Sequence, residues 1–279
     1  MKKVIKIANG QGFWGDSIEA PKRLIEGNEI DYLTLDYLAE VTMSIMQQQK
    51  LKNPKSGYAT DFVDFIDSVA QKIINNNIKI ITNAGGVNPI ACKDALYNRI
   101  SNKLSRNLKV AIILGDDIYD NILDFHNKQH VPFENMDTSK NFNLIKNKIC
   151  SANVYISCFT VAEALSKGAD IVLAGRITDP GLVVGPCIYE FGWGEQDFDK
   201  LAQATVAGHI VECGAQCTGG NFSHWHEVDD FAKLGYPIIK IDSDGTFNVC
   251  KEKMSSGIVN RYTVSEQILY ELGNPKEYL

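Results

Sequence analysis

The chain repeats one unit: a short aliphatic run, a polar loop that contains glycine, and a stretch whose apolar residues have helical spacing. The clearest copy is residues 171–186, IVLAGRITDPGLVVGP, in which the aliphatic run ends at Gly175. Similar units begin in residues 4–16, 78–104 and 109–117. Strands that alternate with helices in this way are typical of a parallel sheet. We therefore predict an α/β, Rossmann-like fold with a mostly parallel sheet flanked by helices.

The last third of the sequence follows a different pattern. Residues 212–222, ECGAQCTGGNF, are rich in small residues and thiols, and a DSDG turn at residues 242–245 separates two strand-like runs. The latter pattern predicts a β-hairpin. We expect residues 1–204 to form an α/β core with glycine-rich strand-end loops. Residues 205–279 are expected to form a smaller β-containing C-terminal extension, packed on this core within one structural unit.

Three segments carry more specific expectations. The apolar spacing in residues 31–46 predicts one helix, with Asp36 and Glu40 one turn apart on it. Residues 152–157 read as a short strand. Asp179 stands directly before a proline, which predicts a helix start with Asp179 as its N-cap.

Charge and composition exclude several classes of protein. The 279 residues carry a formal net charge of −6 and a pI of about 5.4, whereas a nucleic-acid-binding protein needs a basic face. No apolar run approaches the roughly 18 residues that a membrane span needs. Seven cysteines without framework spacing indicate reduced thiols and a cytoplasmic protein. We expect a small anionic molecule as ligand, no nucleic acid, no membrane, and a homo-oligomer on general grounds.

The polar loop that contains Arg176 is the first candidate site. Open α/β sheets bind ligands at the carboxyl ends of their strands. Arg176 and the free N–H groups of the helix start favour an anionic group such as a carboxylate or phosphate. The structural alternative is that Arg176 and Asp179 simply pair and cap the helix. Asp116 follows another aliphatic run and is either a general base or cation ligand, or a helix cap.

A glycine-rich loop follows the first aliphatic run and formally contains the dinucleotide motif G-x-G-x-x-G at Gly10, Gly12 and Gly15. Trp14 is bulky at a place where backbone has to approach a pyrophosphate. The acidic residue expected after a second strand is also lacking, because Asp36 falls in the predicted helix. The loop is therefore interpreted as a general substrate loop rather than an NAD site.

A set of short motifs, in order between residues 12 and 273, resembles the acyclic terpene utilisation AtuA-like family. The motifs are GFWGD, DYLAEVTMSIM, GYATDF, TNAGGVNP, GDD, GADIVLAGRITD, EFGW, AGHIVECGAQCTGGNFS and TVSEQILYELG. The family is named for a gene cluster that degrades acyclic terpenes through CoA thioesters, so the resemblance implies a place in carboxylic-acid or acyl-CoA metabolism. Cys217 departs from the aliphatic or small residue of relatives. The chain also stops inside a matching stretch, and the two alternatives are that the remaining part is absent or that a second subunit supplies it.

Cysteine and histidine residues near the end of the predicted helix raise the question of a metal. His209, Cys213 and Cys217 are spaced i, i+4, i+8, with His224 and His226 nearby, and zinc takes such ligands. Intervening glycines make a continuous helix doubtful, and a free cysteine commonly behaves as a small hydrophobic residue. We expect no metal and assign no cofactor, with a CoA thioester as a candidate substrate.

The favoured hypothesis is an enzyme whose site lies where the strand ends meet residues 212–222. Glu212 or Asp179 would move a proton, and Asp116 and Cys213 are further catalytic candidates. Carboxylates and oxyanion donors suit hydratase, lyase or isomerase chemistry next to a carboxylate or thioester. The candidate substrate-binding residues are Gly12, Trp14, Asp36, Asn83, Gly85, Gly86, Arg176, Thr178, Gly219, Gly220 and Asn221. The alternative is a non-catalytic or partner-dependent ligand-binding subunit whose site another chain completes.

Overall fold

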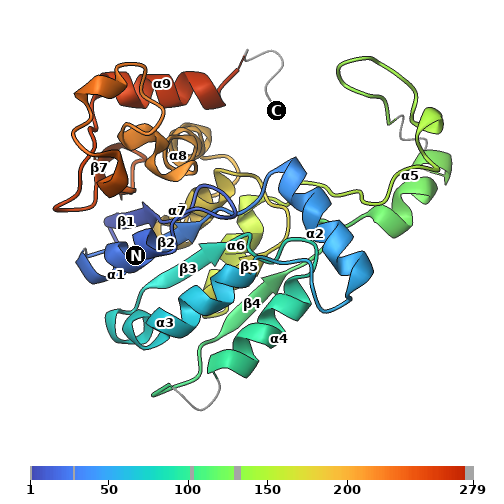
Figure 1. Cartoon of the computed structure of the whole chain (residues 1–279), viewed down its shortest axis with the longest axis horizontal. Coiled ribbons are helices and arrows are strands. Elements are labelled where there is room, and N and C mark those ends of the chain that lie inside the picture. Colours follow the sequence, from blue (N-terminus) through green and yellow to red (C-terminus); the bar gives the residue numbers. More distant parts are fainter. Residues whose placement is uncertain (1, 28, 101–103, 129–132, 274–279) are drawn as a thin grey trace.

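One mixed sheet forms the centre of the molecule. The computed structural model describes residues 2–27, 29–100, 104–128 and 133–273. Within these ranges, seven strands form a sheet in the order β4-β5-β3-β2-β1-β6-β7 (Figure 1). The predicted α/β fold is confirmed.

The five strands that come first in the chain are parallel. They are β1 (Val4–Asn9), β2 (Tyr32–Leu35), β3 (Lys79–Thr82), β4 (Val110–Ile113) and β5 (Ile171–Ala174). The expected hairpin is present as β6 (Pro237–Asp242) and β7 (Phe247–Lys251), and β6 pairs antiparallel with β1. The β-containing C-terminal part therefore extends the same sheet. The division at residues 204 and 205 stays a prediction.

Helices cover both faces of this sheet. The helices of the described residues are α1 (Glu19–Gly27), α2 (Glu40–Lys52), α3 (Thr60–Asn76), α4 (Pro89–Ile100), α5 (Ile122–Lys128), α6 (Cys158–Ser166), α7 (Gly181–Phe191), α8 (Phe198–Val211) and α9 (Arg261–Glu271), and all but α5 and α9 belong to the two layers described next. One core joins α1 to α4 with strand residues such as Ile80 and Leu173. The other joins α6 to α8 with the adjacent residues Ile81 and Val172. Neighbouring residues of a strand face opposite sides, which is why both cores draw on the same short aliphatic runs.

The prediction of one helix over residues 31–46 is wrong. Residues Tyr32–Leu35 form β2, all buried between β1 and β3, and α2 begins only at Glu40. Burial on both faces selects the strand over the helical spacing that the same residues also satisfy. Asp36 therefore follows a strand, and it does not share a helix with Glu40.

Two local expectations are also corrected. Residues 152–157 form only single bridges, Asn153 with Asp117 and Ile156 with Ile177, instead of a strand. Helix α7 begins at Gly181 without a side-chain cap. Asp179 does not cap because its carboxylate faces Arg176, with Oδ1 3.0 Å from Nη2.

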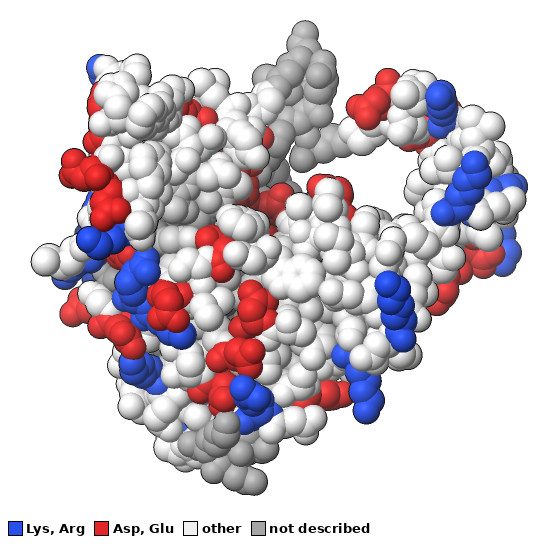
Figure 2. All heavy atoms as spheres, viewed as in Figure 1, with Lys and Arg blue, Asp and Glu red and all other residues white. Residues whose placement is uncertain are grey.

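The segment after β4 leaves the sheet before the chain returns at α6. Figure 1 shows α5 and the described residues that follow it projecting away from the sheet. Among the described residues, no helix is both long and apolar enough to cross a bilayer. Acidic and basic side chains are interspersed on the face that Figure 2 shows.

Candidate functional site

A buried polar side chain follows each of the five parallel strands. These side chains are Asn9 at the end of β1, Asp36 after β2, Asn83 after β3, Asp116 after β4 and Arg176 after β5. Their elements are parallel neighbours, so the five residues lie along one edge of the sheet. Polar groups buried at this density need partners within the protein or a ligand.

Asn9 connects this edge to the segment after α8. Its Nδ2 donates to the carbonyl oxygens of Val211, at 2.5 Å, and Glu212, at 2.6 Å. Asn9 Oδ1 also accepts from the backbone N–H of Gln11 at 3.1 Å. The end of α8 is thereby tied to the carboxyl end of β1. The strand ends and the start of residues 212–222 meet, as the sequence predicted.

Asn83 and Asp36 form a closed network at the ends of β3 and β2. Asn83 Nδ2 donates to Asp36 Oδ1 at 2.7 Å, and Asn83 Oδ1 accepts from the Tyr37 N–H at 2.7 Å. Asp36 Oδ1 also accepts from the Leu38 N–H at 3.0 Å. Its amide positions Asp36 and the chain that follows it. Asn83 was also a candidate for substrate binding, and that role stays a prediction.

Arg176 is held on several sides. Its backbone N–H donates to Asp116 Oδ2 at 2.9 Å, and its Nη1 donates to the Leu38 carbonyl at 3.0 Å. Its Nη2 is 3.0 Å from Asp179 Oδ1, and its guanidinium carbon lies 4.4 Å from the centre of the Tyr155 ring. The expected Arg176–Asp179 pair is therefore present. A guanidinium has five N–H donors, so this buried cation retains capacity for a further acceptor.

A pocket opens beside this arginine. It has a volume of about 240 Å³, and Arg176, Tyr155, Asn153, Met43 and Glu40 contribute to its lining. Its size suits a small carboxylic acid or one end of a longer chain, since most ligand pockets have about 300–1,000 Å³. Asp116 accepts a hydrogen bond from the Arg176 backbone N–H rather than capping a helix, and a role as general base or cation ligand stays a prediction.

Further acidic groups gather around Glu212. His209 Nδ1 lies 2.8 Å from Glu212 Oε1. Glu271 Oε1, from the end of α9, accepts from Gln267 Nε2 at 2.8 Å and from Cys213 Sγ at 2.8 Å. Sequence reasoning missed Glu271 and Gln267, because nothing local indicates that α9 packs against this segment.

Burial favours the neutral forms of the acidic side chains and of the histidine at this edge of the sheet. Burial, with the neighbouring acidic charges, raises the pKa of Glu212 to about 11 and that of Asp36 to about 7. Burial also raises the pKa of Glu271 and of Asp179. Burial lowers the pKa of His209 to about 4, so the shifts of His209 and Glu212 both favour the neutral forms of the imidazole and the carboxyl. Strongly shifted carboxyls that gather at a strand-end edge are typical of proton-transfer sites.

Cys213 has the environment of a protonated thiol. Burial and its hydrogen bond to Glu271 raise the pKa of this thiol well above its usual range. Nucleophilic cysteines react as thiolates. The geometry makes Cys213 a hydrogen-bond donor to Glu271, and any catalytic part for it stays a prediction.

The zinc arrangement that was considered from the sequence, with His209, Cys213 and Cys217 on one helix face, is not formed. Helix α8 ends at Val211, and the buried Cys217 directs its Sγ to the Gly214 carbonyl at 3.8 Å. His224 and His226 instead contact aromatic rings and each other. The described residues bring together two different sets of possible metal ligands, with ligand atoms within 4.8 Å of one another. These sets are His209, Glu212 and Glu271, and Asp36, Asp179 and Glu212.

The glycines chosen as substrate contacts mostly meet protein backbone. A Cβ on Gly12 would lie 2.6 Å from the carbonyl carbon of Cys213, and one on Gly85 would lie 2.5 Å from the Ala174 carbonyl oxygen. Gly86 has a positive φ of 54°. These glycines allow loops to approach one another at the strand ends.

Of the other proposed substrate-binding residues, some form hydrogen bonds within the protein and others lie on its surface. Trp14 Nε1 donates to Asp61 at 3.0 Å, and the Thr178 N–H donates to the Ile156 carbonyl at 3.2 Å. Gly219 is buried with a φ of 118°, whereas Gly220 and Asn221 are exposed. Substrate contact by any of them stays a prediction.

The residues of the formal dinucleotide motif, and the acidic residue after the second strand, make contacts within the protein. Asp36 does follow the second strand, contrary to the reasoning from sequence, yet its carboxylate is engaged by Asn83 and by the Leu38 N–H. A Cβ on Gly10 would lie 2.6 Å from Pro21 Cβ of α1. The absence of a side chain at Gly10 therefore allows α1 to pack closely against the glycine-rich loop. This glycine serves a contact within the protein.

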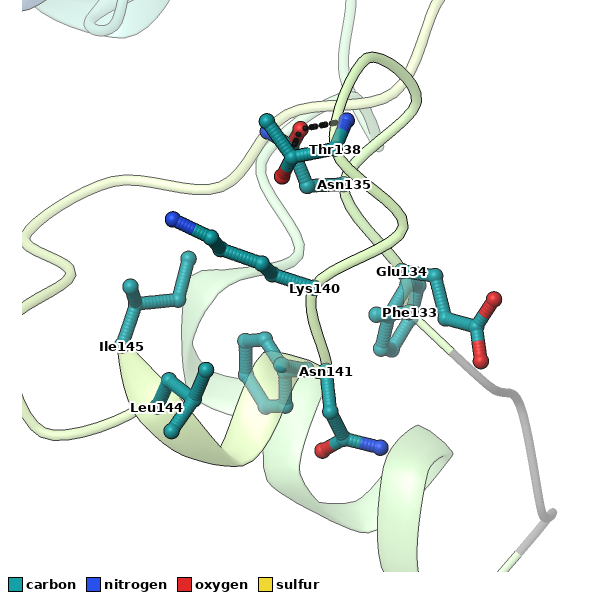
Figure 3. Close-up of a pocket in the computed structure, with 9 residues that line it drawn as sticks. Phe133, Glu134, Asn135, Thr138, Lys140, Asn141, Leu144 and Ile145 are labelled. Carbon is teal, nitrogen blue, oxygen red and sulfur yellow. Dashed lines mark hydrogen bonds between the residues drawn. The ribbon is translucent and has the colours of Figure 1, made fainter.

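A second pocket lies in the projecting segment after α5. Figure 3 shows Phe133, Leu144 and Ile145 around it, with Lys140 beside them. Its volume is about 210 Å³, and it lacks a cluster of acid–base groups in its described lining. The strand-end edge is therefore the better candidate for chemistry.

The chain was compared with models of protein families, with curated proteins and with solved structures. A family model described as acyclic terpene utilisation family protein AtuA matches residues 5–279. No curated protein and no solved structure matches the chain. The resemblance inferred from the motifs is confirmed.

Proposed function

Because this chain belongs to the acyclic terpene utilisation AtuA family, we propose that it is an enzyme that binds a small carboxylic acid, or its acyl-CoA thioester, at Arg176 and transfers a proton at a nearby carbon. Family membership suggests a role in acyclic terpene utilisation. The reaction class is that of a hydratase, lyase or isomerase.

The observation that carries this proposal is the pairing of a buried arginine with buried carboxyls at the strand ends. Arg176 is 6% exposed and borders the 240 Å³ pocket. A guanidinium binds a carboxylate through two parallel hydrogen bonds, and burial strengthens that contact. Its position favours an anionic head group in the pocket.

Asp179 is the proposed proton carrier. Its carboxylate lies 3.0 Å from the Arg176 guanidinium, and its side chain is 37% exposed, so a substrate held by Arg176 can reach it. Burial and the charge of Glu40 raise the pKa of Asp179 although the Arg176 guanidinium opposes this shift, and a raised pKa favours proton uptake by the carboxylate. Proton removal next to a carbonyl leads to isomerisation or to elimination of water. The reverse of that elimination is hydration of a double bond.

Hydrogen exchange on the substrate tests this role. Branched, unsaturated acids and their CoA thioesters are incubated with the protein in D2O, and deuterium uptake is followed by NMR. We expect exchange with the wild-type protein and a loss of about 10²-fold or more with Asp179→Asn. Undiminished exchange with Asp179→Asn, in a folded variant, would exclude Asp179 as the carrier.

Two further expectations remain proposals. We keep the cytoplasm as the compartment, because unpaired cysteines at all seven positions are typical of a reducing environment. We also keep a homo-oligomer, which sedimentation velocity would test directly.

A further inference from the structure

His209, Glu212 and Glu271 offer ligand atoms to a common point. One atom of each lies within 4.8 Å of the others, and the residues come from the end of α8, the turn after it and the end of α9. The distance from His209 Nδ1 to Glu212 Oε1 is 2.8 Å. Two ligands at 2.0–2.2 Å from one ion in tetrahedral geometry are separated by about 3.4 Å. This pair, joined by a hydrogen bond in the structure, would have to separate by roughly half an ångström to hold an ion.

Unpaired polar atoms at the same place provide independent support. Glu212 is only 7% exposed, and its Oε2 accepts no hydrogen bond from any described residue, although the protonated carboxyl shares a hydrogen bond with Glu271. Gln267 is 1% exposed, and while its Nε2 donates to Glu271, its Oε1 has no partner among the described residues. Buried polar atoms are nearly always satisfied in folded proteins, so these two indicate a place where a ligand contributes.

The charge balance points to a cation. Four acidic side chains, Asp36, Asp179, Glu212 and Glu271, gather at this edge, with Arg176 as the guanidinium among them. Burying carboxylates without compensation is costly. A dication would allow these buried carboxyls to be ionised and would give Glu212 Oε2 a partner.

The ligand types select the class of ion. An imidazole with carboxylates suits Zn²⁺ or Mn²⁺, whereas Mg²⁺ and Ca²⁺ prefer all-oxygen sites. We propose that His209, Glu212 and Glu271 bind one divalent transition-metal ion, Zn²⁺ or Mn²⁺, next to the Arg176 pocket. Three protein ligands leave coordination positions open, as in catalytic rather than structural sites. The ion would then polarise an oxygen of a molecule held by Arg176, which goes beyond the function proposed above.

Metal binding without substrate tests the proposal. Chelator-treated protein is titrated with ZnCl₂ and MnCl₂ by calorimetry, and Mn²⁺ is also followed by electron paramagnetic resonance. We expect one ion per chain, and an affinity at least about tenfold lower in His209→Gln and Glu271→Gln. Asp36→Asn and Asp179→Asn, from the neighbouring carboxylate set, are the matched controls and should bind within about threefold of wild type.

Several outcomes would overturn it. These are the absence of saturable one-to-one binding, tighter binding of Mg²⁺ or Ca²⁺ than of Mn²⁺, or a loss confined to the Asp36 and Asp179 variants. Circular dichroism and melting of the metal-free variants report folding. If His209→Gln does not fold, Glu271→Gln at the end of α9 decides alone. This titration needs no substrate, so its failure is distinct from failure of the proton-transfer proposal.

Discussion

The side-chain amide of Asn83 donates a 2.7 Å hydrogen bond to the carboxylate of Asp36, across the carboxyl ends of β3 and β2. Asn83 is fully buried, and its Oδ1 also accepts from the Tyr37 N–H. One side chain thus fixes both an acidic group of the candidate site and the backbone that leads to α2. The Arg176 Nη1 bond to the Leu38 carbonyl continues this connection to β5.

Replacement of Asn83 by alanine should destabilise the fold. The change leaves the Tyr37 N–H and the Asp36 carboxylate with one partner fewer in a buried place, at a cost of about 1–3 kcal/mol in the free energy of unfolding. Urea unfolding followed by circular dichroism measures the loss. Asn248→Ala, on the exposed side of β7, is the control and should stay within about 0.5 kcal/mol of wild type. Equal stabilities of the two variants would contradict this role for Asn83.

Gly175→Ala should disturb the positioning of Arg176. A Cβ at this position would lie 2.6 Å from Asp116 Oδ2, the atom that accepts from the Arg176 N–H. We expect a loss of about 1–3 kcal/mol in unfolding free energy, because the carboxylate has to move from a packed place. Gly194→Ala, where the nearest atom is 3.9 Å away, is the matched control. A Gly175→Ala protein as stable as Gly194→Ala would show that the Asp116 contact is dispensable.

Asp170, directly before β5, should make the free energy of unfolding depend on pH. Asp170 is buried and binds Arg106, at 2.6 Å, Lys79, at 2.8 Å, and the Lys109 N–H, at 3.0 Å. Although burial opposes the charged form, these three partners hold the pKa of the carboxyl well below its usual range. A lowered folded-state pKa contributes stability above the unfolded value of about 3.9, and this contribution falls as the pH drops below it.

Asp170→Asn should therefore cost about 2 kcal/mol near neutral pH and progressively less toward pH 2–3. Urea unfolding of both proteins at several pH values measures the difference. A difference that is the same at pH 7 and pH 3 would show that the charge of Asp170 is not responsible.

The sequence identifies most of this sheet because its strands are short aliphatic runs bounded by polar glycine loops. That pattern placed Asn83, Asp116 and Arg176 correctly at strand ends. It failed for Asp36, because the residues of β2 satisfy helical spacing as well, and only burial between β1 and β3 decides between the two. Local sequence carries no information on two-sided burial of this kind.

The candidate site was less accessible to sequence reasoning. The proximity of Arg176 and Asp179 follows from their spacing, and the meeting of Glu212 with the strand ends was expected. The presence of Glu271 at the site was not expected, because its position depends on the packing of α9 against the turn after α8. The metal question changed for the same reason: His209 joins Glu212 and Glu271 rather than cysteines.

The most direct test of the account is the affinity of the purified protein for branched, unsaturated acids and their CoA thioesters, with and without the charge of Arg176. Arg99→Gln removes the same charge from the surface of α4, where Arg99 pairs with Asp64 and Asp67. By calorimetry we predict binding to wild type and Arg99→Gln, and at least about tenfold weaker binding, or 1.4 kcal/mol, to Arg176→Gln. A folded Arg176→Gln protein that binds as tightly as wild type would contradict the central claim that Arg176 is the anion-binding group.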